Sequence, residues 1–312
     1  MRLFDLCGGA TKGAGISAFA KTIMDAGIMP DIIVSVSYSS YIAVALALSK
    51  DFPDLREKIV RLSTTVTPEQ FMEVNPVNKN GGFTIKALWR VTKHILTFGL
   101  LKPEISAGVQ NLDALIEELV PEDLFAVYQD GDYAPVYISA LDYKTRKPVF
   151  FNVKDKSVTY KKFKAIMNAS GTMPFYTQGS RVNGRLHFDT GVTDQNAGYK
   201  FLKEYPYIAL KVKEVFSLYA RPEGFEIDDA EEPETGFDVF NWMMLCITIE
   251  RSLNDEENIM RYCIDYNIKW SAGYLDWIMK SFYDTNPARL EQLKNSSIQR
   301  AKEFVKDYGK VK

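Results

Sequence analysis

The start of the chain repeats one pattern, a short apolar strand followed by a turn and a helix, and this repeat predicts a parallel β-sheet. Residues 3–7 form a predicted buried strand that stops at two glycines, and residues 16–26 have the apolar spacing of a helix. Residues 31–36, rich in Ile and Val, form the next predicted strand. The alanine-rich residues 38–49 then predict a helix that is buried nearly all round.

The remainder of the chain is predicted to extend the same α/β fold. Helices are expected at residues 54–71, 84–98, 112–119 and 160–169, and strands at residues 133–141, 147–153, 186–189 and 207–219. An acidic loop is expected at residues 221–236, and residues 238–308 are expected to be helical throughout. We therefore expect one α/β domain over residues 1–220 and a helical C-terminal extension, residues 221–312, packed on the same domain.

Charge and cysteine content exclude several classes of function. The net charge of −2 lacks the basic excess with which nucleic-acid-binding proteins neutralise phosphates, so no nucleic-acid partner is expected. Three scattered cysteines, Cys7, Cys246 and Cys263, fit neither a disulfide framework nor a zinc site, and no metal is expected. A secretory signal is not expected, and no apolar run approaches the roughly 20 residues of a membrane span. We expect a cytoplasmic protein.

The turn after the second strand is the most informative stretch. It reads Ser35-Val36-Ser37-Tyr38-Ser39, between a strand and an apolar helix. A sharp strand-to-helix turn raises a serine hydroxyl above the sheet edge, next to the positive end of the helix dipole. The usual sequence of such a nucleophile turn is G-x-S-x-G, and here both glycines are replaced by serine. By itself the stretch fits either a nucleophile at Ser37 or a serine-rich helix cap.

The glycine-rich loop after the first strand, residues 7–15, offers backbone N–H groups to an anionic oxygen. It departs from a Walker A loop, because Ala14 and Gly15 stand where Lys and Ser or Thr are needed. It departs from a dinucleotide fingerprint, because Ala10 replaces the second glycine. An oxyanion loop and a purely structural glycine turn both remain open at this point.

A serine nucleophile needs a proton acceptor within hydrogen-bond reach. The chain has two histidines. His94, on the amphipathic helix, is expected to be a surface residue or one with its hydrogen bonds satisfied. His187 shares a strand face with Asp189 and is either a tuning group or structural. Asp189 ends a predicted strand and is followed by Thr190-Gly191. A carboxylate at a strand end, facing a helix N-terminus, is the simpler candidate for the base.

In this order, the stretches GGATKG, SVSYS and DTG resemble the motifs of the patatin-like phospholipase family. The stretches KTIMDAGIMPDIIVSVSYSS and ASGTMPFYTQGSRVNGRLHFDTG also resemble the family, and the resemblance covers roughly residues 1–215. It implies a three-layer α/β sandwich with a mainly parallel central sheet, to which the C-terminal helices are added. It also implies hydrolysis of acyl esters of glycerolipids through an acyl-enzyme, without metal or cofactor. Carried over by position, the implied residues are the nucleophile Ser37, its base Asp189, and an oxyanion hole lined by Gly8, Gly9, Ala10 and Lys12.

The chain departs from the family's motifs at four small residues, Ser35, Ser39, Ala10 and Thr190, which stand where the family has glycine. Tyr38 is bulky and is expected to narrow the acyl site. The leading hypothesis is a lipid acyl-hydrolase of the phospholipase A or esterase type. A catalytically impaired patatin-like binding or scaffold protein and an unrelated α/β nucleotide binder are the alternatives. The apolar face of residues 84–101 is expected either to meet lipid, in a peripheral membrane contact, or to be plain core.

Overall fold

A central eight-stranded sheet organises the part of the chain that the computed structural model describes, which comprises residues 1–65, 67, 72–74, 84–96, 106–110, 112–224, 236–276 and 285–308. Its strands are β1 (Arg2–Leu6), β2 (Ile32–Val36), β5 (Val136–Asp142), β6 (Lys147–Asn152), β8 (Ser180–Val182), β9 (Arg185–Asp189), β10 (Glu214–Tyr219) and β11 (Lys269–Tyr274). The order is β11-β10-β1-β2-β5-β9-β8, with β6 also paired to β5. The first five strands in this order are parallel, and the pairings of β6, β9 and β8 are antiparallel.

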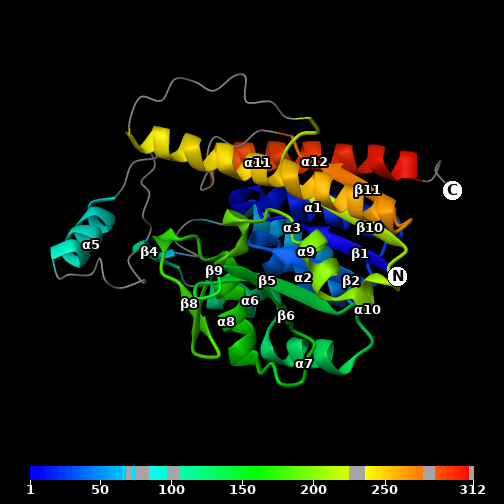
Figure 1. Ribbon diagram of the computed structural model, residues 1–312, viewed down its shortest axis with the longest axis horizontal. Helices are drawn as coiled ribbons and strands as arrows, with labels where there is room; N and C mark the ends of the chain where they lie inside the picture. Colours follow the sequence, from blue (N-terminus) through cyan, green and yellow to red (C-terminus); the bar gives the residue numbers. More distant parts are fainter. Residues whose placement is uncertain are drawn as a thin grey trace.

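Helices cover both faces of this sheet, which confirms the expected layered α/β architecture (Figure 1). One face carries α1 (Gly13–Asp25), α2 (Tyr38–Leu48), α3 (Asp54–Thr65), α6 (Asp113–Leu119), α7 (Glu122–Asp130), α8 (Tyr160–Gly171) and α12 (Pro287–Tyr308). The other carries α9 (Gly198–Glu204), α10 (Pro206–Ala209) and α11 (Gly236–Asp265). A smaller sheet of β3 (Met72–Val74), β4 (Ser106–Gln110) and β7 (Phe175–Thr177) lies apart from the central one, as does α5 (Ile85–Leu96).

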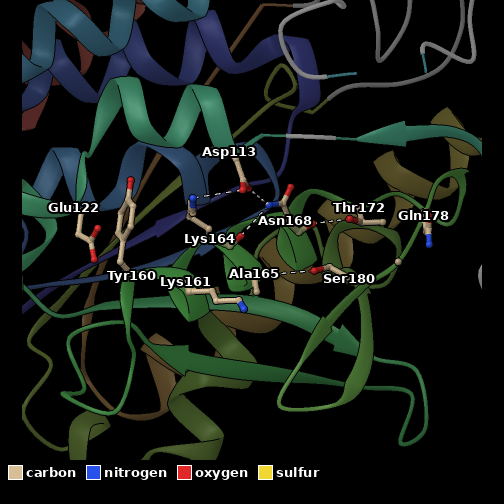
Figure 2. Close-up of a pocket in the computed structure, with 11 residues that line it drawn as sticks. Asp113, Glu122, Tyr160, Lys161, Lys164, Ala165, Asn168, Thr172, Gln178 and Ser180 are labelled. Atoms are coloured by element: carbon tan, nitrogen blue, oxygen red, sulfur yellow. Dashed lines mark hydrogen bonds and ion pairs between the residues drawn. The ribbon is translucent and has the colours of Figure 1, made fainter. Parts of the chain in front are cut away.

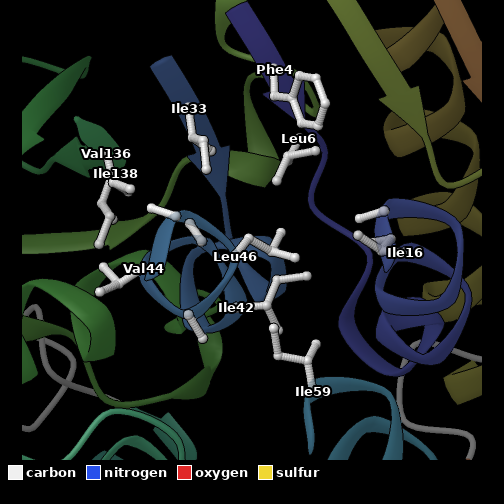
Figure 3. Packing of buried hydrophobic residues seen from close by; sticks show 14 of the residues in the cluster. Phe4, Leu6, Ile16, Ile33, Ile42, Val44, Leu46, Ile59, Val136 and Ile138 are labelled. Carbon is white, nitrogen blue, oxygen red and sulfur yellow. The ribbon is translucent and has the colours of Figure 1, made fainter. Parts of the chain in front are cut away.

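The alternation of side chains along each strand explains the two layers. In β1, Phe4 and Leu6 belong to one hydrophobic core and Leu3 to the other. Figure 3 shows Phe4 and Leu6 in the first core, where Ile33 of β2 and Ile42 of α2 also lie. Because α2 is apolar nearly all round, it is buried between the sheet and its neighbouring helices, as its sequence predicts.

The C-terminal region is mainly helical, but the expectation that residues 238–308 are helical throughout is wrong at β11. Asn267, at φ 52°, adopts the left-handed conformation that ends α11, and the Ile268 N–H donates back to the Cys263 carbonyl at 2.8 Å. The chain then pairs in parallel with β10, from Lys269 beside Glu214 to Tyr274 beside Tyr219. The extension therefore supplies an edge strand as well as helices, and the boundary at residue 220 stays a prediction.

The expected strand at residues 207–219 is also shorter than predicted. Pro206 opens the short helix α10, where its missing N–H costs nothing, and β10 begins only at Glu214. The shorter β10 still lies beside β1. From β1, the strands β2 and β5 are added on one side, whereas β10 and β11 are added on the other. The carboxyl ends of β1, β2 and β10 therefore meet at one edge of the sheet, the usual place for a ligand site in such folds.

Candidate active site

Ser37 occupies a strained turn between β2 and α2. Its backbone angles are φ 55° and ψ −127°, a region that costs a residue with a side chain on the order of 1–3 kcal/mol. The turn is held from two sides: the Ser37 N–H donates to Ser170 Oγ at 3.1 Å, and its carbonyl accepts from the Ser40 N–H at 3.0 Å. Ser170, on α8, also lies 2.9 Å from Ser40 Oγ. Ser170 and Ser40 together therefore hold the strained backbone conformation of Ser37.

Ser35 and Ser39, which replace the two glycines of the usual nucleophile turn, each have hydrogen bonds of their own. Ser39 Oγ contacts the Leu6 carbonyl and the Val36 carbonyl, both at 2.9 Å, and accepts from the Val36 N–H at 3.1 Å. Ser35 is fully buried, with its Oγ 3.5 Å from the Tyr137 carbonyl. Ser39 therefore ties the ends of β1 and β2 together at the turn, which a glycine cannot do.

Asp189 lies at the end of β9, opposite Ala140 of β5. Its N–H donates to the Thr172 carbonyl at 2.7 Å, and its Oδ1 accepts from the Gly191 N–H, also at 2.7 Å. Burial raises the pKa of Asp189 to about 6, and hydrogen bonds from the Ser37 side chain and the Gly191 N–H counter part of that rise. Two residues far apart in sequence, Ser37 and Asp189, thus lie close enough for the Ser37 side chain to lower the pKa of Asp189.

Thr190, which replaces the middle glycine of the aspartate motif, is fully buried. Its Oγ1 lies 2.9 Å from Ser139 Oγ of β5. His187 is directed elsewhere: its Nε2 is 3.6 Å from Asp142 and its Nδ1 is 2.9 Å from the Arg185 carbonyl. Burial lowers the pKa of His187, so the neutral ring is favoured. Of the two readings left open for His187, these contacts favour the structural one. The side chain of His94 lies outside the described residues.

The glycine loop contains two residues with unusual roles. Ala10, at φ 44°, takes a left-handed conformation that glycine adopts more easily. Lys12 is buried, and its Nζ donates to the Ala220 carbonyl at 3.1 Å, at the end of β10. Burial lowers the pKa of Lys12 to about 7. The loop is therefore fastened to β10 by a lysine that ionises less readily than an exposed one.

The four expected oxyanion residues differ in what their backbone N–H groups do. The Gly8 N–H donates to the Gln195 carbonyl at 2.9 Å, and the Lys12 N–H donates to the Gly9 carbonyl at 2.8 Å. Among the described residues, no such bond is found for the N–H groups of Gly9 and Ala10. These two groups are therefore the ones the loop can offer to a ligand.

A small cavity of about 20 Å³ lies between the glycine loop and α11. Its walls include Gly8, Gly9 and Lys12 on one side and Thr248 and Ser252 of α11 on the other. A cavity of this size holds about one water molecule. Ser37 itself is only 9% exposed and Asp189 only 4%, so little of either residue is accessible in the described structure.

A second cavity, of about 700 Å³, lies along α8, and most of the residues that line it are polar or charged (Figure 2). Lys164 and Asp113 form an ion pair of 3.5 Å across it, and Asn168 Nδ2 donates to Asp113 at 3.0 Å. Pockets for apolar ligands are lined mainly by apolar side chains, and this cavity is not. We therefore do not assign an acyl chain to this cavity, although the carbonyl of Thr172, which lines it, accepts from the Asp189 N–H.

Comparison with known proteins identifies a family match that includes these segments. A family model for patatin-like phospholipases matches residues 6–197, which include the glycine loop, Ser37 and Asp189. The crystal structure of VipD from Legionella pneumophila aligns with a TM-score of 0.46 and 11% sequence identity, covering 98% of this chain and 66% of that chain. No curated protein matches the sequence.

Proposed function

Since the chain belongs to the patatin-like phospholipase family, we propose that it is a lipid acyl-hydrolase of the phospholipase A or esterase type whose nucleophile is Ser37 and whose base is Asp189. The observation that carries the proposal is a serine on a strained strand-to-helix turn that lies beside a buried carboxylate, whose pKa the serine side chain lowers. Such a pair can act without a histidine, and His187 is turned towards Asp142 instead.

The proposed reaction has two halves. Ser37 Oγ attacks the ester carbonyl carbon while its proton passes to Asp189, and the carbonyl π electrons move onto the oxygen. The intermediate then collapses, the C–O bond to the alcohol breaks, and Asp189 returns the proton to the leaving alcohol. A water molecule, deprotonated by Asp189, attacks the acyl-enzyme, and the carboxylic acid leaves as Ser37 regains its proton.

The oxyanion of each intermediate is proposed to bind the N–H groups of Gly9 and Ala10. Gly8 and Lys12 were expected to share this role, but their N–H groups already have partners, which narrows the proposal to two donors. In characterised hydrolases, loss of one such donor costs roughly 3–4 kcal/mol of transition-state stabilisation. Lys12 is proposed to support the loop through its bond to Ala220.

A peripheral contact with a lipid surface is proposed for α5. Three apolar side chains of this helix are exposed, Ile85, Leu88 and Trp89, the first of them at 86%. Plain core is therefore ruled out for these three residues. Lys86, Arg90 and Lys93 alternate with them, and residues 85–96 contain no acidic residue, so the helix suits an anionic lipid surface. Among the described residues, no helix has the length and apolar content to span a bilayer.

A catalytically impaired binding protein of the same family is the second candidate. The low exposure of Ser37 and Asp189 and the occupied Gly8 N–H favour it, because both reduce what a substrate can contact. Labelling by a fluorophosphonate probe separates the two candidates, since the probe reacts only with an activated serine.

The deciding experiment compares wild type, Ser37→Ala and Asp189→Asn in probe labelling and in hydrolysis of short-chain p-nitrophenyl esters and a phospholipid. Ser296→Ala, on α12, is the control for a serine outside the site. We expect labelling and hydrolysis in wild type and Ser296→Ala, and loss of both in Ser37→Ala. Equal activity, or equal inactivity, of wild type and Ser37→Ala would refute the enzymatic proposal.

A further inference from the structure

Gln195 is bonded to both halves of the candidate site. Its main-chain carbonyl accepts from the Gly8 N–H at 2.9 Å, and its side-chain Nε2 donates to the Gly191 carbonyl. Gly191 in turn donates its N–H to Asp189 Oδ1 at 2.7 Å. A single residue thus joins the glycine loop to the turn that orients the carboxylate.

The backbone of residues 195–196 is itself held by a residue from the C-terminal region. Asp255 Oδ2 accepts from the Gln195 N–H at 2.7 Å and from the Asn196 N–H at 3.1 Å. Asn196 Nδ2 donates to the carbonyls of Asp5 and Leu218, both at 3.2 Å, at the ends of β1 and β10. Asp255 lies on α11, outside residues 6–197 that match the family model.

The loop that Gln195 holds is in close contact with the nucleophile. A Cβ built on Gly8 would lie 3.1 Å from Ser37 Cβ and 3.5 Å from Gln195 Oε1. Gly8 therefore has little freedom to shift between Ser37 and Gln195. A displacement of residues 195–196 would move Gly8, and with it the neighbouring N–H groups of Gly9 and Ala10. Errors of about 1 Å in such a site can lower a rate by about a hundredfold.

We infer that Gln195 and Asp255 are positioning residues: Asp255 of α11 fixes the backbone at residues 195–196, and Gln195 sets the spacing between the oxyanion loop and Asp189. This inference rests on the proposed function, because the spacing matters only if Ser37, Asp189 and the loop act on one carbonyl. It gives the C-terminal helix α11 a part in catalysis through Asp255, which contacts the backbone of residues 195–196.

The test uses the full chain and four variants. Asp255→Leu removes the acceptor with little change of size, whereas Asp255→Asn keeps one acceptor oxygen. Gln195→Glu keeps the shape of the side chain but removes its N–H donor to Gly191. Glu257→Gln, an exposed neighbour on the same helix, is the control. The readouts are the rate of fluorophosphonate labelling at Ser37, kcat and KM for a p-nitrophenyl ester, and amide hydrogen exchange of the peptide containing Gly8–Lys12.

We expect Asp255→Leu and Gln195→Glu to lower the labelling rate and kcat by about tenfold or more, with KM little changed. Exchange of the loop amides is expected to rise in Asp255→Leu. Asp255→Asn should recover most of the loss, and Glu257→Gln should match wild type. A merely structural role would instead lower the melting temperature without separating kcat from KM.

Two results would overturn the inference: unchanged loop exchange and labelling in Asp255→Leu, or a loss in Asp255→Asn as large as that in Asp255→Leu. If Asp255→Leu does not fold, Gln195→Glu decides the matter by the same rates. A wild-type protein that the probe does not label refutes the proposed function instead. In that case, loop exchange still decides whether Asp255 holds the loop in place.

Discussion

The ring of Tyr38 lies against the main chain of Gly13, so closely that a Cβ on Gly13 would fall 2.2 Å from ring atom Cε1. Gly13 closes the glycine loop and Tyr38 follows the proposed nucleophile, so this contact joins the two motifs directly. The Tyr38 hydroxyl lies 2.5 Å from Ser63 Oγ, which holds the ring against α1 and α3. The bulky residue beside Ser37 is therefore packed inwards.

The first prediction concerns this contact. Gly13→Ala is expected to lower the free energy of unfolding by about 1–3 kcal/mol, because the ring must move although φ −49° itself suits alanine. In a Tyr38→Ala background the same alanine should cost much less. Urea unfolding of the two single variants and the double variant measures the coupling. An equal cost in both backgrounds would contradict the contact.

The second prediction is a pH profile. Because burial raises the pKa of Asp189 to about 6 and the base must be ionised, the labelling rate of Ser37 should rise as pH increases through about 6 and then level off. The rate is measured with the fluorophosphonate probe, and circular dichroism at each pH verifies that the protein stays folded. A midpoint near 4, the ordinary value of an aspartate, would mean that the carboxyl is not buried as described.

The third prediction concerns membrane contact. Leu88→Ser with Trp89→Ser should weaken binding to vesicles of phosphatidylserine and phosphatidylcholine by about tenfold or more, because exposed apolar area is lost. Hydrolysis of a soluble ester should be unchanged. Leu210→Ser is the matched control, since Leu210 is an apolar residue 78% exposed on another part of the surface. Similar binding by the double variant and the control would argue against α5 as the docking helix.

The fourth prediction concerns Asp5, which is fully buried on β1 and accepts from the Gly198 N–H at 3.0 Å. Burial raises the pKa of Asp5 to about 7, above its value in the unfolded chain. The protonated carboxyl therefore stabilises the fold fully below about pH 4, and this contribution is lost as pH rises through about 7.

Asp5→Asn stays neutral and keeps an acceptor for Gly198. Its free energy of unfolding should therefore fall less than that of wild type between about pH 5 and pH 8. Urea unfolding at the two pH values measures the difference. Parallel losses in wild type and variant would show that Asp5 does not titrate in this range.

The N-terminal half of the site could be predicted because its signals are local. Each element of this half has a composition that indicates its conformation: the first strand, the glycine loop, the helix after it, and the strand-to-helix turn at Ser37. The structure has these elements in the expected order. Asp189 could be proposed as the base from its place at a strand end, and the order of the family motifs supported this choice. No local pattern brings β9 to Ser37, because that contact depends on the register of Asp189 with Ala140 on β5.

Asp255, β11 and the hydrogen bonds of Ser39 and Thr190 could not be predicted in the same way, because each depends on contacts between distant parts of the chain. Asp255 is one acidic residue among several on a long helix, and only the tertiary fold aims it at the backbone of Gln195. β11 was missed because a short edge strand is defined by its partner, although Asn267 offered a local sign that α11 ends. The hydroxyl bonds of Ser39 and Thr190 likewise depend on strands distant in the chain.

The place of β1 between β2 and β10 has a consequence for biosynthesis. The strand made first is among the last to be completed, because Arg2 pairs with Glu214, which leaves the ribosome far later. At a translation rate of roughly 5–20 residues per second, β1 therefore lacks its partner β10 for on the order of ten seconds or more. We therefore expect the growing polypeptide to need chaperone protection during translation, even though its N-terminal segments have strong local structure.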